Sequence, residues 1–394
     1  MPPEPENPAR RQPNPFRPGF NQAPLTLAGR DVEIETAREA LQVAAYDGRT
    51  PRPVLLEGPR GVGKTVLLGR IAELAGQELS WPSVNLEITR GTALLPALIE
   101  RLTEQARSLL GRPGQQRPTG RTRISAVKVQ AGATGVGGEV AFDRSAPAEP
   151  APTIAGALAE VAHAASTARA GLVLTLDELQ LAHRDDLAEL AAALQEAVPA
   201  NWPLVVVAAG LPSMHGSKRR PTPTYFERGE WLEIGFLNPD DARLALTSPA
   251  QAGGRPMDPD AVQVLLTYAG GYPYALQVVG HHAWRCSTDE PTITVDAARR
   301  AQPAIARDLA ALFRSRWADA STKEQEYLQA LAAASEHGPV GGRAVADELG
   351  VPTHRISYLR ERLIEKGTLY AANDVLHFIA PGMRDWITST HPRP

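Results

Sequence analysis

Residues 58–65 read Gly-Pro-Arg-Gly-Val-Gly-Lys-Thr, and no other segment limits the possible folds of this chain as strongly. The octet follows a short apolar run at 54–56 and precedes an apolar-periodic stretch that begins at Val66, so it lies where a strand turns into a helix. Its glycines allow backbone angles that point successive N–H groups at one anion, and the helix N-terminus adds partial positive charge. The sequence therefore predicts a phosphate-binding loop; the alternative is a Gly-rich turn that matches the pattern by chance.

The predicted loop supplies groups for both a nucleotide and a metal ion. We expect Lys64 to reach the β- and γ-phosphates of ATP, and the Thr65 hydroxyl to bind Mg²⁺. The loop residues expected to surround the phosphates are Gly58, Pro59, Arg60, Gly61, Val62 and Gly63. ATP and Mg²⁺ are thus the predicted cofactors.

A second pattern completes a hydrolysis site. Residues 171–176 form an unbroken apolar run, as in a buried parallel strand, and the run ends in Asp177-Glu178. Asp177 is expected to hold the Mg²⁺ shell, while Glu178 orients and polarises the attacking water. The alternative is an ordinary exposed acidic pair at a strand end.

Composition excludes several classes of protein. A chain of 394 residues is expected to form two or three domains. Its 41 basic and 44 acidic residues give a net charge of −3, so any nucleic-acid-binding surface must be local. The single cysteine, Cys286, excludes an internal disulfide and indicates a reduced, cytoplasmic protein without structural zinc. No apolar run approaches the length of a membrane span.

Two segments depart from the α/β alternation. Residues 1–24 contain eight prolines and are expected to form a disordered arm, or alternatively a docking peptide for a partner. Residues 111–150 are expected to be a β-hairpin inserted into the core. The part at 111–130 carries five basic residues and no acidic one, which leaves open whether it contacts nucleic acid or is a solvated insertion.

Three further motifs make a family resemblance specific. Leu27–Glu33 (Leu-Ala-Gly-Arg-Asp-Val-Glu) resembles the entry motif of origin-recognition-type AAA+ ATPases and of related archaeal and STAND ATPases. Gly270–Tyr274 resembles the Gly-x-Pro signature of their lid, and Leu376–Trp386 resembles the end of their winged-helix module. In that family Gly29 and Arg30 would pack near the adenine, and Pro273 would lie in the lid part of the nucleotide site.

The resemblance implies an α/β fold with an AAA+ P-loop core at 25–237, a parallel five-stranded sheet in the order 5-1-4-3-2. A helical lid at 238–320 and a C-terminal winged helix-turn-helix domain at 321–394 would follow. Arg228 occupies the place of an arginine finger, which enters a neighbouring subunit's site and implies self-assembly; the alternative is a local salt bridge.

Two departures from the family pattern favour slow hydrolysis or a nucleotide-binding switch. The strand at 204–209 ends in Ala208-Ala209-Gly210 and lacks a polar residue to help place the water. The lid offers no clear sensor arginine, although Arg285 lies about three helical turns after Pro273.

The last unit has a helix-turn-helix pattern. We expect helices near 322–334 and 343–349, a turn at 350–352, and a helix at 353–366 with Thr353 as its N-cap. DNA contact is one hypothesis for Arg355 and Arg362 and for the basic segments at 111–130 and 218–220, the last of which is more simply interpreted as a solvated loop. Residues 321–394 nevertheless contain eight basic and nine acidic residues, so a purely structural winged helix stays open.

The sequence supports two main functional hypotheses, and the missing polar residue at the end of the strand at 204–209 leaves open a third, a nucleotide-binding adaptor that does not turn over. The first is an ATP-binding and ATP-hydrolysing AAA+ protein that oligomerises through its nucleotide sites and acts on DNA or a DNA-bound partner. The second is a STAND-like signalling switch, in which nucleotide sets the position of the lid and winged helix and the output is a protein interaction.

Overall fold

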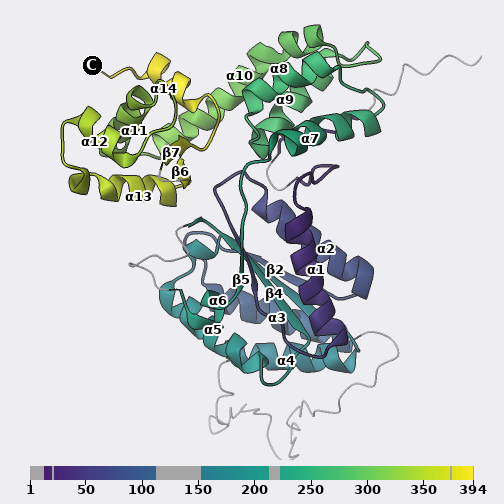
Figure 1. The fold of residues 1–394 in the computed structure, drawn as a ribbon. Helices are drawn as coiled ribbons and strands as arrows, with labels where there is room; N and C mark the ends of the chain where they lie inside the picture. The colour runs from purple at the N-terminus through teal and green to yellow at the C-terminus, as the bar shows by residue number, and fades with distance from the viewer. Residues whose placement is uncertain (1–12, 20–21, 112–151, 213–221, 373–374, 394) are drawn as a thin grey trace, which may run out of the picture.

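The computed structural model describes residues 13–19, 22–111, 152–212, 222–372 and 375–393, which form a sheet-containing half and a helical half (Figure 1). The expected insertion at 111–150, apart from Gly111, lies outside the described residues, and so does the basic cluster at 218–220. None of the described helices combines the length and the apolar character that crossing a bilayer requires.

Five parallel strands form one sheet in the order β2-β3-β4-β1-β5, which confirms the predicted order. The central strands β3 and β4 are buried along their whole length, as parallel strands covered on both faces should be. Because all strands run the same way, their carboxyl ends meet at one edge, where ligands bind in folds of this kind. The strands are β1 (Val54–Glu57), β2 (Ser83–Glu87), β3 (Leu172–Asp177), β4 (Leu204–Gly210) and β5 (Glu230–Glu233).

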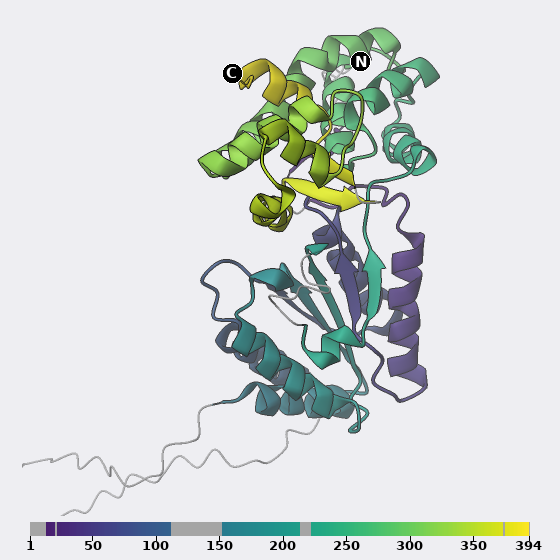
Figure 2. The ribbon, with the colours of Figure 1, turned by 60° about the vertical axis from the view of Figure 1, so that its left-hand side comes forward.

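Helices cover both faces of the sheet (Figure 2). Successive side chains along β1 point to opposite faces and pack against different sets of helices. Val54 and Leu56 pack in one hydrophobic cluster with α1 (Asp31–Tyr46) and α2 (Lys64–Leu79). Leu55 points the other way, into a cluster with the remaining helices of this half. These are α3 (Leu94–Leu110), α4 (Ile154–Thr167), α5 (Arg184–Ala197) and the short α6 (Thr224–Glu227).

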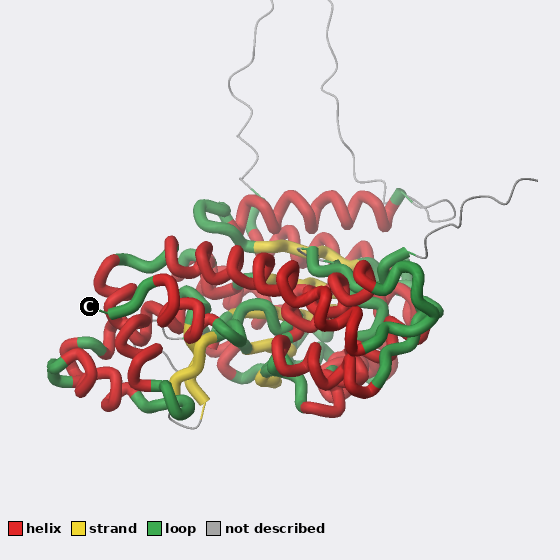
Figure 3. The backbone as a smooth tube through the Cα atoms, turned by 90° about the horizontal axis from the view of Figure 1, so that it is seen from above, coloured by secondary structure: helices red, strands yellow, loops and turns green. Residues whose placement is uncertain are grey.

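The helical half contains the segment predicted to be a lid, called the lid below, and the C-terminal unit, and the two share one continuous hydrophobic cluster. The lid helices are α7 (Pro239–Ala252), α8 (Pro259–Ala269), α9 (Pro273–Cys286) and the long α10 (Val295–Ala318). Three of them begin with proline, whose fixed φ and missing N–H suit the first helical position. The C-terminal unit contains α11 (Thr322–Ala334), α12 (Gly342–Leu349), α13 (Ser357–Glu365), the antiparallel strands β6 (Leu369–Ala372) and β7 (Val375–Phe378), and α14 (Met383–Thr390). Figure 3 shows β6 and β7 apart from the central sheet.

The expected single helix at 353–366 is wrong at its start. Thr353 does not cap it, because residues Thr353–Arg355 form a separate 3-10 turn, η3, and α13 begins only at Ser357. Ile356 lies between the two with φ −118° and ψ −5° and is buried. At this break Ile356 packs in the hydrophobic cluster of the helical half.

The N-terminal arm is also not disordered throughout, because residues 13–19 pack on α9. Phe16 is 2% exposed and lies against Gly280, where an added Cβ would come within 2.4 Å of its ring. Asn14 Nδ2 donates to the His281 carbonyl at 3.1 Å, and the Arg17 N–H donates to Gln277 Oε1 at 3.0 Å. The proline content predicted that residues 13–19 would lack helix and strand, as they do. It could not show that the Phe16 ring would pack against Gly280, which has no Cβ to exclude it.

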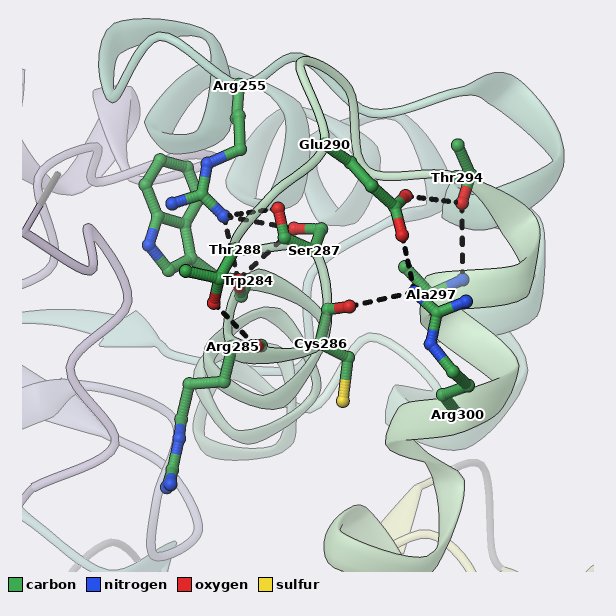
Figure 4. Close-up of polar contacts among 10 residues, drawn as sticks. All are labelled: Arg255, Trp284, Arg285, Cys286, Ser287, Thr288, Glu290, Thr294, Ala297 and Arg300. Atoms are coloured by element: carbon green, nitrogen blue, oxygen red, sulfur yellow. Dashed lines mark hydrogen bonds and ion pairs between the residues drawn. The ribbon is translucent and has the colours of Figure 1, made fainter. Parts of the chain in front are cut away.

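A polar cluster closes the carboxyl end of α9 (Figure 4). Arg255 Nη1 donates to the Trp284 and Ser287 carbonyls, both at 2.9 Å, and its guanidinium lies 3.8 Å from the Trp284 ring centroid. Arg300, on α10, donates to the Cys286 carbonyl at 2.8 Å. The last carbonyls of a helix have no partner within it, so these arginines satisfy them and hold the α9–α10 connection.

Replacing Phe16 by alanine should lower the free energy of unfolding by about 3–5 kcal/mol, because the side chain is buried and its removal leaves a cavity. Val32→Ala is the matched control, since Val32 is 71% exposed and its loss should change stability by no more than about 0.5 kcal/mol. Denaturant unfolding curves measure both. Equal midpoints for the two variants would show that Phe16 is not anchored in solution.

Candidate nucleotide-binding site

The predicted phosphate loop lies between β1 and α2, at the carboxyl edge of the sheet. Gly61 has φ +80°, and a Cβ there would lie 1.9 Å from the Tyr272 hydroxyl, so no other residue fits. At Gly58 a Cβ would lie 2.1 Å from the Ile234 carbonyl oxygen, next to the end of β5. The glycines thus let neighbouring segments approach the loop as closely as an anion-binding turn requires.

Lys64 is the first residue of α2 and is 6% exposed. Its Nζ donates to the carbonyls of Gly58 and Pro59, both at 2.7 Å, so its ammonium group lies inside the loop. Burial lowers the pKa of Lys64 to about 8, although Glu178 and Asp177 oppose the shift. Because burial disfavours the charged form of Lys64, a bound phosphate that pairs with the ammonium group would stabilise that form.

The two predicted magnesium ligands meet. Thr65 Oγ1 donates to Asp177 Oδ2 at 2.5 Å, which joins the phosphate loop to the end of β3. Burial raises the pKa of Asp177, while hydrogen bonds from Thr65 and from the Glu178 N–H oppose the shift. No group of three metal-ligating side chains is found in the described part of the chain. A hydroxyl and a carboxylate still fit Mg²⁺ at such a loop, where phosphate oxygens and water provide the other ligands.

Glu178 follows Asp177 with a left-handed backbone, φ 55°, and is one of the residues that line the cavity beside the loop. Gln180, which the sequence did not single out, donates from Nε2 to Glu178 Oε2. Its Oε1 accepts the Leu211 N–H at 3.1 Å, just beyond β4. The base expected to activate water is therefore held by a side chain from the same turn.

The cavity has a volume of about 480 Å³, within the range of small-molecule sites. Residues from four parts of the chain line it: the N-terminal segment, the phosphate loop with the start of α2, the turn after β3, and the lid with the segment that leads into it. Of the predicted residues, the lining includes Arg30, Arg60, Gly61, Val62, Gly63, Lys64, Thr65, Glu178 and Pro273. Gly29, Gly58, Pro59 and Asp177 are not in the lining, although Gly29, Pro59 and Asp177 adjoin residues that are, and the Gly58 carbonyl accepts a hydrogen bond from Lys64.

Arg30 has a structural contact where a base-contacting role was expected. Its Nη2 donates to the Gly235 carbonyl at 2.6 Å and to the Val62 carbonyl at 3.1 Å. Burial lowers the pKa of its guanidinium, while Glu33 and Asp241 oppose the shift. Arg30 thus connects the phosphate loop to the chain that leaves β5, and its contacts fix the loop's position.

Arg316, on α10, enters the cavity from the helical half. The Nε atoms of Arg316 and Arg60 are both buried, and neither has a hydrogen-bond partner among the described residues. Burial and the charge of Arg60 lower the pKa of Arg316. Two guanidinium groups with unmet donors beside a phosphate loop fit an anionic ligand. The sequence offered no clear arginine for this place; Arg285, which lies about three turns after Pro273, is exposed and does not line the cavity.

Arg228 does not join this site. It is exposed and precedes β5, whose Glu230 pairs with Val54 at the beginning of β1. The phosphate loop follows the other end of β1, where Glu57 pairs with Glu233. Arg228 therefore lies at the opposite edge of the sheet from the loop of its own chain.

Of the two arginines of the C-terminal unit predicted to contact DNA, one is free of ion pairs to described residues and the other pairs with a buried carboxylate. Arg355 is exposed on η3. Arg362 lies 3.0 Å from the carboxylate of Glu324, which is fully buried and also binds Lys366 at 2.7 Å. Two of the positive charges of the 353–366 segment thus pair with a carboxylate inside the unit.

The C-terminal unit touches the phosphate loop (Figure 2). The backbone of Gly367 packs on Arg60, where an added Cβ would lie 2.8 Å from the arginine Cγ. Phe236, just after β5, lies between Tyr272 of the lid and Tyr370 of β6, with ring centroids 5.2 and 5.3 Å away. The Tyr272 hydroxyl donates to the Arg60 carbonyl at 3.1 Å. Core, lid and C-terminal unit therefore meet beside the loop.

Comparison with known proteins agrees with this geometry. The family model described as an AAA ATPase domain matches residues 26–207, and a domain of unknown function, DUF8462, matches residues 310–387. No curated protein matches the sequence. The solved Walker-type ATPase of Pyrococcus abyssi is similar over 91% of this chain and 95% of its own, with a TM-score of 0.59 and 15% identity, which shows a shared fold.

Two other solved structures are less similar. Cdc6p from Pyrobaculum aerophilum has a TM-score of 0.48 and 16% identity over 94% of this chain and 95% of its own. The Orc1 protein of Aeropyrum pernix, solved in complex with DNA, has a TM-score of 0.45 and 16% identity over 93% and 94%.

The pKa of Lys64 leads to a test with ADP in the absence of Mg²⁺. Below about pH 8 the free protein already carries the charge that phosphate needs, so affinity should be constant there and should fall as pH rises further. In Lys64→Arg, whose guanidinium stays charged, overall binding should be weaker but should lose this pH dependence. Calorimetric titrations from pH 7 to 10 measure both, and parallel pH profiles would contradict the assignment.

Proposed function

Starting from the AAA ATPase domain at residues 26–207, which has the AAA+ P-loop fold, we propose that this chain is a magnesium-dependent enzyme that binds and hydrolyses ATP. The observation that carries the proposal is the hydrogen bond from Thr65 to Asp177, with Glu178 next in the chain and lining the same cavity. This contact brings the phosphate loop and the acidic pair, 112 residues apart, into one site.

The charges around the cavity match those of a triphosphate. Lys64, Arg60 and Arg316 would bind the phosphate oxygens, and the unmet Nε donors of the two arginines would gain acceptors. Thr65 and Asp177 would hold Mg²⁺, which neutralises phosphate charge when bound. Such fixed cations stabilise charge in the transition state without having to reorganise.

Glu178 would act on water. Its carboxylate takes a proton as the water oxygen bonds to the γ-phosphorus, and the bond from that phosphorus to the bridging oxygen breaks. ADP leaves with the electron pair of the broken bond, and inorganic phosphate is the second product.

We also propose that the chain assembles with copies of itself through this site. Arg228 has no ion pair within the part of the chain that the structure describes and is exposed, which supports the arginine-finger hypothesis over a local salt bridge. Its place at the far edge of the sheet means that it could serve only a neighbour's nucleotide.

A nucleotide-controlled switch is the second candidate function, and the contacts that the lid and the C-terminal unit make with the site favour it. Arg316 extends from α10 into the cavity, and Gly367 packs on Arg60, so a bound phosphate would act on both contacts. DNA binding through Arg355 stays a prediction. Salt-dependent DNA binding with ATP would support action on DNA, whereas nucleotide-dependent protein assembly without DNA affinity would support the switch.

Glu178→Gln should keep ATP affinity within about twofold and lower turnover by roughly 100-fold or more, because the amide cannot accept the proton from water. Phosphate release and calorimetric ATP titration measure the two quantities. Glu189→Gln, an exposed change on α5, is the control for loss of one negative charge. Undiminished phosphate release in Glu178→Gln would assign the base elsewhere.

Arg228→Ala should be slow in hydrolysis on its own while binding ATP normally. Mixed with Glu178→Gln it should recover activity, because an intact Arg228 then completes an intact site in its neighbour. Phosphate release across mixing ratios measures the recovery, and Arg314→Ala, an exposed change on α10, serves as the control. Mixtures whose rates are only the weighted average of the two variants would exclude a shared site.

A further inference from the structure

The strand between β1 and β3 provides no polar group to the reaction. β4 is buried along its whole length and ends in Ala208-Ala209-Gly210. Because all of its side chains are apolar, none can donate or accept a hydrogen bond that would orient water or a base. The side chain that fills this gap comes from another element. Gln180 belongs to the short turn η1 (Leu179–Leu181), directly after Glu178.

Two of the contacts of Gln180 fix which way its amide points. The Leu211 N–H can only donate, so the group facing it at 3.1 Å must be the carbonyl Oε1. The amino group Nε2 must then face Glu178 Oε2, and an ionised carboxylate can only accept. The network permits one orientation of the amide, with a donor aimed at the base.

The donor, Gln180 Nε2, restrains Glu178, whose backbone conformation is unfavourable. Glu178 has a left-handed backbone, φ 55°, which costs a non-glycine residue conformational energy and places its side chain at the cavity. Oε2 accepts from Gln180, whereas Oε1 accepts no hydrogen bond from the described residues. One carboxylate oxygen is thus fixed and the other is left for a water molecule.

We propose that Gln180 is the positioning residue for Glu178, and that it ties the base to the end of β4 through the Leu211 N–H. A polar side chain from the turn after β3 thereby orients the base, because β4 has no polar side chain that could do so. The proposal rests on the proposed ATP hydrolysis and adds to it a residue that acts through Glu178.

Gln180→Met tests the proposal, because methionine has the same chain length without the amide. The kcat of ATP hydrolysis should fall about 10- to 100-fold, since a misplaced catalytic group loses rate rather than substrate affinity. KM and the calorimetric Kd for ATP should stay within about twofold. Gln195→Met, an exposed change on α5, should leave all three unchanged. An unchanged kcat, or a rise in KM that accounts for the loss, would overturn the proposal.

A second variant separates the two hydrogen bonds. Gln180→Glu keeps an oxygen for the Leu211 N–H, so the fold around β4 is preserved even where the methionine variant unfolds. It places an acceptor where Glu178 needs a donor, and like charges at hydrogen-bond distance repel. Its kcat should be at least as low as that of Gln180→Met, with unchanged ATP affinity. Wild-type kcat in Gln180→Glu would overturn the proposal.

A double variant shows whether Gln180 acts through Glu178. In single-turnover experiments Glu178→Gln with Gln180→Met should be no slower than Glu178→Gln alone, because the residue to be positioned is already lost. A further loss as large as that of Gln180→Met in the wild-type background would mean an independent structural role and overturn the proposal. Absence of hydrolysis by the wild-type chain would overturn the proposed function itself. Normal hydrolysis that depends on Glu178 but not on Gln180 would overturn this inference alone.

Discussion

The hydrogen bond between Thr65 and Asp177 is the contact on which the site depends. It can form because β1 and β3 are parallel, so the loop after one strand and the acid at the end of the other reach the same edge of the sheet. Asp177 is 6% exposed, and a carboxylate buried to this degree needs a donor or a cation nearby. Bound Mg²⁺ would therefore offset the free-energy cost of burying the Asp177 carboxylate.

The same electrostatic logic extends to the cations. Lys64, Arg60 and Arg316 lie around one cavity, and burial lowers the pKa of Lys64 and of Arg316. Carboxylates compensate part of this charge, since Glu178 raises the pKa of both Lys64 and Arg316. An excess of buried donors, visible at the two arginine Nε atoms, is what an anionic ligand can satisfy.

The cavity also depends on segments far from the phosphate loop. Phe16 fastens the N-terminal segment to α9, and Arg255 with Arg300 secures the carboxyl end of the same helix. Tyr272 and Gly367 bring the lid and the C-terminal unit onto Arg60. A ligand at the phosphate loop would therefore be coupled to the position of the whole helical half, because the contacts are made by packed elements that share one hydrophobic cluster.

Local pattern determined the phosphate loop, the buried strand that ends in Asp177-Glu178, and, with the family resemblance, the strand order. Such features are encoded by neighbouring residues, since a glycine spacing or an apolar run needs no distant partner. Only the tertiary structure decided that Phe16 is buried, that Gln180 binds Glu178 and that Arg316 lines the cavity, for which the sequence offered no clear arginine. It also paired Arg362 with a buried Glu324. The contacts of Phe16, Arg316 and Arg362 join residues far apart in the chain, and that of Gln180 depends on where β4 ends, so packing and charge compensation in three dimensions select them and periodicity cannot.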